Sequence, residues 1–448
     1  MIKTKQIYLF FFLYVSVFSV VMQFSYAYQQ KKAVAIANFE NLSKSQEYDW
    51  IGTGFVETLT SKLVYVNSVR VVERSQIKEI INEQKLQMSG AVDQDTIVKC
   101  GFLEIEYMIV GSYQKSGNNL KVIARIIDIK NSKGEKSVEV EGRFNDLFAI
   151  QNELIIKISH AIGTSVSERE RIKIAVSPTK NLIIYEWYTK GVNCYDKNEY
   201  DKSLEYYEKA LKLSEVEKDE KIKPAIFNGI ANIYAETSNY ENAIEFYNKS
   251  LTIYEKIKNE SDIATTYFNI GCIYKNQNDY NNAFVCFNKG LKLAERVRDE
   301  KLMAELYVML GNIYRARNNY TQAIKCCEEA LKVIEKLTVL GDLQTKSVCY
   351  AIIGDIHMAS GKNKEAINYY NKSLDIIETG SEIKDKQLMA LILYNMTVLY
   401  GKQAEYRIAL YFANKALAAY QKIGDETSIQ ETQLLVKQLT TELEKKEK

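Results

Sequence analysis

The chain has 448 residues, of which 46% are hydrophobic and 26% are charged. This is the composition of a folded soluble protein, and the length predicts two or three domains. The formal net charge is +2, and none remains once Lys3 and Lys5 of an N-terminal leader are set aside. Such a balance excludes the electrostatic footprint of a nucleic-acid-binding protein and of binding to an anionic membrane surface.

Residues 1–27 have the pattern of a secretory signal peptide. The basic "MIKTK" precedes the apolar "IYLFFFLYVSVFSVV", and "SYA" then places Ser25 and Ala27 at the −3 and −1 positions of a cleavage site before Tyr28. The alternative is an uncleaved anchor, but the apolar stretch is shorter than the about 20 residues that cross a bilayer. No cysteine follows it directly to carry a lipid. We therefore expect export to the periplasm, with cleavage of the leader.

Residues 28–165 predict an α/β sandwich of the order βαβα(α)βββα. The apolar run "AVAIANFE" predicts a buried strand, and the next segment has helical periodicity. Three strand-like runs near the end of the domain are joined by the turn signals "SGNN" and "NSKGE". Strands are expected at 33–40, 69–74, 107–115, 119–130 and 136–144, and helices at 49–66, 75–86, 93–104 and 145–166.

This domain resembles the CsgG family of curli export components and the related TolB N-terminal-like domain. The resemblance rests on "AVAIANFEN", "WIGTGFVETLTSKL", "VVERSQIKEIINEQKLQMSGAVDQDT", "IEYMIVGSY" and "RIIDIKNSKG". It implies a periplasm-facing protein, associated with the outer membrane, that assembles with itself or with envelope partners. Here, however, tight turns join the strands in place of long membrane-crossing hairpins, so we exclude a secretion pore formed by this chain alone.

After a linker at 166–183, one helical phrase recurs six times. Each copy opens on a small residue, and these small residues are spaced at intervals of 40, 40, 40, 43 and 43. The opening residues are Gly191, Ala231, Gly271, Gly311, Gly354 and Thr397. A large apolar residue lies four positions earlier, and a second small residue lies twelve positions later. Each copy therefore predicts two antiparallel helices that cross at their small residues.

The phrase resembles the tetratricopeptide repeat, in a variety with long second helices. Six units fit, at 184–217, 224–257, 264–297, 304–337, 347–380 and 390–423, and residues 424–448 predict a capping helix. Because a lone helix pair cannot bury its apolar face, the units must stack into a superhelical solenoid. The overall fold class is thus α+β with two domains. Ser203 in the first unit, and Thr397 in the last, depart from the pattern.

The resemblance also implies that an extended peptide or a partner helix binds along a concave groove lined by the first helices. Asparagine side chains there can grip a ligand backbone, and Lys275 and Arg315 can hold a carboxylate. The alternative is that these residues belong to solvated helix faces. The matching groove residues are Tyr188, Val192, Asn228, Asn232, Phe268, Lys275, Asn312 and Arg315.

We find no motif for catalysis, metal binding or a cofactor in the sequence. The chain has only two histidines, His160 and His357, and no CxxC pair among its seven cysteines. The adjacent Cys326 and Cys327 are the pair that redox chemistry would use. Gly52-Thr53-Gly54 is too short for a dinucleotide fingerprint and is interpreted as a helix entry.

Two functions remain. The first is a non-enzymatic envelope scaffold, in which the CsgG-like domain docks or self-assembles and the repeats recruit a protein. The second is an envelope sensor or adaptor, whose N-terminal domain binds a small ligand or a cell-wall-linked partner. In either case, membrane association is peripheral or through an uncleaved leader.

Overall fold

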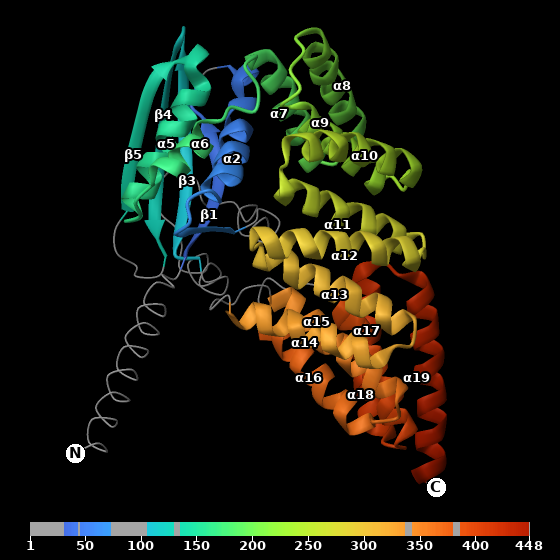
Figure 1. The fold of residues 1–448 in the computed structure, drawn as a ribbon. Coiled ribbons are helices and arrows are strands. Elements are labelled where there is room, and N and C mark those ends of the chain that lie inside the picture. The colour runs from blue at the N-terminus through green and yellow to red at the C-terminus, as the bar shows by residue number, and fades with distance from the viewer. Residues whose placement is uncertain are drawn as a thin grey trace, which may run out of the picture. The chain divides into compact units, whose positions relative to one another are not determined.

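The computed structural model of the chain describes residues 31–43, 45–72, 105–129, 135–336, 343–379 and 386–447 (Figure 1). They form two compact units, a sheet domain and the helical repeats. The expected leader and the helices expected at 75–86 and 93–104 lie outside the described residues. Among the residues that are described, no helix is long and apolar enough to cross a membrane.

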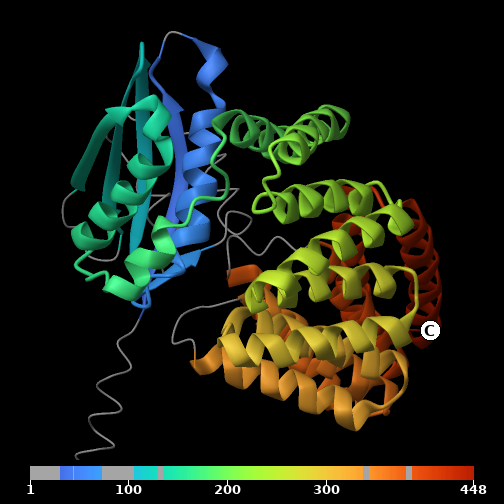
Figure 2. The same ribbon diagram turned by 45° about the horizontal axis from the view of Figure 1, so that its top comes forward.

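The sheet domain is a five-stranded mixed sheet with its described helices on one face (Figures 1 and 2). The strand order is β2-β1-β3-β4-β5; β1 runs parallel to β2 and β3, and β3, β4 and β5 pair as antiparallel hairpins. Because parallel neighbours need a crossover, a helix joins β1 to β2. The elements are β1 Lys32–Asn41, α2 Trp50–Leu63, β2 Val69–Val72, β3 Tyr107–Ser116, β4 Asn119–Asp128, β5 Glu135–Arg143, α5 Leu147–Ala161 and α6 Glu168–Ala175.

Helices α2 and α5 pack on the same face of this sheet. Phe55 of α2 stacks on Phe39 of β1 with ring centroids 5.3 Å apart. A Cβ atom built on Gly111 of β3 would lie 2.1 Å from the Phe39 ring, so only glycine fits beneath that ring. On α5, Ile150 lies over Gly142 of β5. These contacts form the core of the predicted α/β sandwich, which the structure confirms.

Helix α6 occupies part of the segment that was expected to be a linker. Ser167 and Glu170 form a capping box at its start. The buried Lys62 of α2 donates from Nζ to the Ile174 carbonyl oxygen at 2.7 Å and to Asn152 Oδ1 at 2.6 Å. The sheet domain therefore extends to Val176, and residues 166–167 and 176–181 of the expected linker lack a helix.

From Leu182 onward, the described residues form six helix pairs followed by one long helix, which confirms the all-α solenoid. The pairs stack in chain order (Figure 2), and Leu439 of the last helix packs against Ala409 and Ala413 of the sixth pair. The pairs are α7 Leu182–Asp196 and α8 Tyr200–Val216, α9 Lys223–Glu236 and α10 Tyr240–Ile257, α11 Glu260–Asn276 and α12 Tyr280–Val297, α13 Glu300–Ala316 and α14 Tyr320–Lys336, α15 Leu343–Ala359 and α16 Asn363–Thr379, and α17 Lys386–Lys402 and α18 Tyr406–Ile423, with α19 Glu426–Glu447 last.

The turn inside each pair has the same geometry. The residue seven positions after the opening small residue is left-handed in all six pairs, and it is a glycine only at Gly361. The next N–H group then donates to the carbonyl five residues earlier, as Asp279 does to Tyr274 at 2.8 Å, which is the hydrogen bond of a Schellman motif. Ser203, a departure in the first unit, is buried and donates its hydroxyl to the Gly191 carbonyl oxygen.

Candidate functional site

The predicted groove residues all lie on the first helices of the pairs and are half-buried. We count positions within a repeat from its opening small residue, which is position 0. Asn232, Asn312 and Asp355 then share position 1 of their repeats, and Lys275 and Arg315 share position 4. This register allows each junction between repeats to be compared with the next one.

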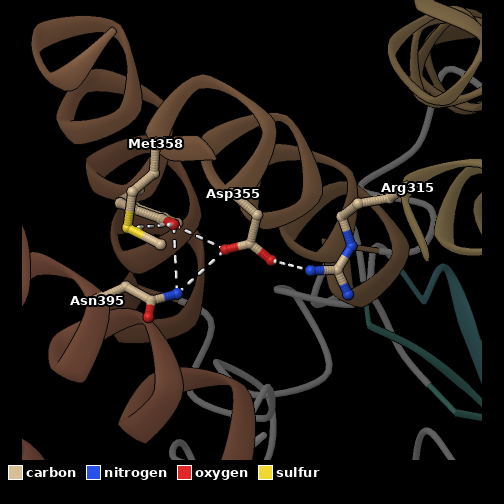
Figure 3. A network of polar contacts seen from close by, with 5 residues as sticks. Arg315, Asp355, Met358 and Asn395 are labelled. Carbon is tan, nitrogen blue, oxygen red and sulfur yellow. Dashed lines mark hydrogen bonds and ion pairs between the residues drawn. The ribbon is translucent and has the colours of Figure 1, made fainter. Parts of the chain in front are cut away.

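A polar network joins the fourth, fifth and sixth repeats (Figure 3). Asp355 of α15 lies at its centre. Its Oδ2 atom accepts from Arg315 Nη1 of α13 at 2.7 Å, and its Oδ1 atom accepts from Asn395 Nδ2 of α17 at 3.1 Å. The Tyr370 hydroxyl of α16 donates to the same Oδ1 at 2.7 Å and accepts from Asn395 at 3.2 Å. The network therefore fixes three consecutive first helices to one carboxylate.

The side chain of Asp355 is largely buried, with 16% of its surface exposed, whereas 41% of the Arg315 side chain is exposed. Burial raises the pKa of Asp355, and the Tyr370 hydroxyl, the Arg315 guanidinium and the Asn395 amide oppose that rise. Burial also raises the pKa of Tyr370, and the charge of Asp355 adds to this effect. The positive charge of Arg315 is thus already paired within the fold.

A second network of the same register joins the second and third repeats. Tyr247, at position 16 like Tyr370, donates its hydroxyl to Asn232 Oδ1. Asn269, which corresponds to Asn395, contributes a second side-chain hydrogen bond to Tyr247. Because a buried hydroxyl needs polar partners, an asparagine or aspartate accompanies the tyrosine at both junctions.

The junction of the third repeat with the fourth, and that of the fourth with the fifth, lack this tyrosine. Position 16 holds Phe287 in the third repeat and Cys327 in the fourth, and neither has a hydroxyl. The residue that corresponds to Asn269 and Asn395 is then apolar, Met309 and Ile352 respectively. Asn312, at position 1 of the fourth repeat, consequently has no tyrosine hydroxyl from which its Oδ1 atom could accept a hydrogen bond.

The structure divides the predicted groove residues into two sets. Tyr188 and Phe268 pack with their rings 6.0 Å from those of Tyr207 and Phe287, and Asn232 and Arg315 are paired as described above. Val192 is half-buried. Asn228 Oδ1 is buried without a hydrogen-bond partner, and within the described part of the chain no hydrogen bond or ion pair is made by the side chains of Lys275 and Asn312.

Asp355, Tyr370 and Asn395 were not among the predicted groove residues. A signal was present, because Arg315, Asp355 and Asn395 are each 40 residues apart in the sequence. The repeat pattern does not match the hydroxyl of Tyr370, at position 16, to partners on the neighbouring first helices.

The residues considered for other chemistry are packed into the repeats. Burial raises the pKa of Cys326 to about 11, so this thiol lacks the thiolate character that redox chemistry uses. Cys327 is fully buried. His357 stacks on Tyr369 with ring centroids 5.4 Å apart. Within the described ranges, no group of three or more His, Cys, Asp or Glu side chains is placed to hold a metal ion.

Comparison with known families identifies both parts of the chain. Residues 16–143 match the model of the curli production assembly/transport component CsgG. Tetratricopeptide repeat models match residues 184–215, 223–296, 302–379 and 347–422. The chain therefore joins a CsgG-like domain to a tetratricopeptide repeat array, as the sequence predicted.

Among curated proteins, none matches this chain. Solved structures similar to it include the apo form of RapI, which is 15% identical, covers 58% of this chain and 99% of its own, and has a TM-score of 0.44. BtubC from P. vanneervenii is 18% identical, with 52% of this chain and 90% of its own covered and a TM-score of 0.40. MamA is 20% identical, with 43% and 96% covered and a TM-score of 0.33.

Proposed function

We propose that this protein is a non-enzymatic, exported scaffold of the bacterial cell envelope. In this proposal the CsgG-like domain docks at the envelope or self-assembles, and the first helices of the repeats bind a protein partner. The match to tetratricopeptide repeats supports a role in protein–protein interaction. Export and periplasmic location rest on the leader sequence and on the resemblance to CsgG.

The observation that carries the proposal is a set of polar side chains on the first helices that lack a partner within the described part of the chain. Asn228, Lys275 and Asn312 are half-buried, and their side chains have no partner in the described part of the chain. A buried polar atom without a partner, such as Asn228 Oδ1, costs free energy. A bound chain with exposed main-chain N–H and C=O groups would pair with Asn228 and offer partners to Lys275 and Asn312. The groups lie on helices, so they are held in place before a partner arrives.

Site-specific photocrosslinking in living cells tests the binding surface. A benzoylphenylalanine placed at Asn312 is expected to capture a discrete partner, whereas one placed at Lys292, an exposed residue on α12, is expected to capture none. Equal capture at the two positions would contradict binding along the first helices.

Cell fractionation and the mass of the purified chain test export. We expect the chain in the envelope fraction, with an N-terminus at Tyr28. A full-length chain confined to the cytoplasmic fraction would contradict the envelope part of the proposal but leave the partner-binding surface open to the crosslinking test.

A further inference from the structure

Helix α6 presents an exposed face that combines aliphatic and basic side chains. Ile172 and Val176 lie four residues apart and share this face, where they are 62% and 56% exposed. The cations Arg169 and Lys173 lie on the same face and are also exposed. Residues 168–175 come after the CsgG match, which ends at 143, and before the first repeat match, which begins at 184. Neither family model therefore accounts for this face.

The turn after α2 extends the face. Helix α6 lies beside the end of α2 (Figure 1), and the Lys173 Nζ atom is 5.6–5.8 Å, printed as 5.7 Å, from the centroid of the Tyr65 ring. Tyr65 and the preceding Val64 are both exposed. Large apolar side chains from two segments are therefore exposed together at one corner of the sheet domain. We call this surface the α6 corner, and it comprises Val64, Tyr65, Arg169, Ile172, Lys173 and Val176.

Hydrogen bonds on the opposite side of α6 keep this face turned outward. Glu170 and Ile174, four residues apart, form the buried side of the helix. The Asn67 N–H group donates to Glu170 Oε1 at 2.7 Å, and Lys62 Nζ donates to the Ile174 carbonyl oxygen at 2.7 Å. A rotation that buried the aliphatic side chains of α6 would break both contacts. These side chains therefore remain in water until another surface covers them.

We propose that the α6 corner docks on the surface of a phospholipid bilayer. This inference rests on the proposed function and names the surface by which the CsgG-like domain meets the envelope. Ile172 and Val176 enter the boundary between headgroups and acyl chains, which is also the depth that a tyrosine ring such as Tyr65 prefers. The long stems of Arg169 and Lys173 let their charged groups reach the lipid phosphates.

Two features favour a bilayer over a protein partner. The α6 corner has six residues, whereas a stable protein interface uses about 20–30 residues on each side and requires a matching shape. Cations also alternate with the aliphatic side chains, and Arg169 and Lys173 outweigh Glu168, the first residue of the helix. The neutral balance of the whole chain gives no long-range attraction to an anionic surface. Apolar contact and local contacts with phosphates therefore supply the affinity, and we expect reversible binding.

Flotation with vesicles of phosphatidylethanolamine and phosphatidylglycerol provides the test, with the chain from Tyr28 onward so that the leader cannot insert. We expect the native chain to float with the vesicles. Ile172→Glu and Val176→Glu should each lower the partition coefficient about tenfold, because each removes an apolar contact and adds a charge. The matched control Ile257→Glu replaces an aliphatic side chain that is 57% exposed on the repeats, and it should bind as the native chain does.

An Ile172→Trp variant tests the depth of insertion, and brominated lipids should quench its fluorescence beyond that of the native chain. Hydrogen exchange of α2 and α5 in each variant shows that the sheet domain remains folded. Absence of native binding to the vesicles, or equal loss in Ile257→Glu, would overturn the inference. A benzoylphenylalanine at Ile172 that captures one protein and no lipid in cells would overturn it in favour of a protein partner.

The proposed function has separate tests. Photocrosslinking at Asn312 examines the repeats, and the N-terminus of the purified chain examines export. Failure of vesicle binding would leave both results standing. A full-length chain confined to the cytoplasmic fraction would contradict the envelope part of the proposed function whatever the vesicles show, so the two failures are distinguishable.

Discussion

Replacement of Asp355 is expected to loosen three repeats at once. The Asp355→Ala variant leaves the buried Tyr370 hydroxyl without its carboxylate acceptor at 2.7 Å and removes one of the two acceptors of the Asn395 amide, at 3.1 Å. Hydrogen bonds to a charged acceptor contribute about 1.5–3 kcal/mol each, whereas Arg315 is 41% exposed and its ion pair contributes about 0.5 kcal/mol. We therefore expect a loss of about 3 kcal/mol in local stability. Asp355→Asn recreates the Tyr247–Asn232 arrangement of the second repeat, and its expected loss is about 1 kcal/mol.

Native-state hydrogen exchange is the appropriate assay, because stacked repeats open locally and one global unfolding free energy does not describe them. The amides of α15, α16 and α17 should lose protection, while those of α9 and α10 should not change. An Arg315→Ala variant and the double variant with Asp355→Ala should show a coupling of about 0.5 kcal/mol. Equal losses for Asp355→Ala and Asp355→Asn would refute the assignment of Asp355 as the shared acceptor.

Three further outcomes are expected. Burial lowers the pKa of Lys62 from 10.5 to about 8, so the unfolded chain binds this proton more tightly than the folded chain does. The free energy of unfolding of the sheet domain should therefore rise by up to about 3 kcal/mol between pH 8 and 10.5. Lys62→Met should lose that rise in urea titrations followed by Trp fluorescence, and an unchanged pH slope would contradict the assignment. Ala404→Gly should stabilise the sixth repeat and Gly361→Ala should destabilise the fifth, because both residues have a left-handed backbone. Each change should amount to about 1 kcal/mol in local hydrogen exchange, and opposite signs would argue against backbone strain at these turns. Cys272 and Cys326 both have a pKa of about 11, so they should react with iodoacetamide at pH 7 roughly a hundredfold more slowly in the native chain than in urea. Rapid labelling of the native chain would show that these thiols are not buried.

The helical repeats could be predicted because their signal is redundant. Six small residues at regular intervals each require a second helix to cross closely, so an error at one copy does not change the register of the others. The strands of the sheet domain were predictable for a similar reason, since apolar runs alternate with turn signals. Both predictions depend on patterns that a single sequence displays in full.

Helix α6 and the polar networks depend on contacts that the sequence does not display. The segment "ERERIKIA" is too polar to predict a packed helix, and it is held by a hydrogen bond from Lys62, which lies more than 100 residues earlier. In the same way, Asn232 and Asn312 occupy the same position of their repeats. Which of them is paired depends on the residue at position 16, Tyr247 in one case and Cys327 in the other.

The positions of the two networks bear on the proposed binding of a partner along the first helices. The second and third repeats are joined by Tyr247 and its asparagines, and the fourth to sixth repeats by Asp355 and its donors. Lys275 and Asn312 lie between these networks, on helices whose neighbours are already fixed. Side chains held on rigid elements lose less conformational entropy when a ligand binds. The networks therefore stabilise the backbone that carries these two polar groups, without contacting the partner that we propose for the first helices.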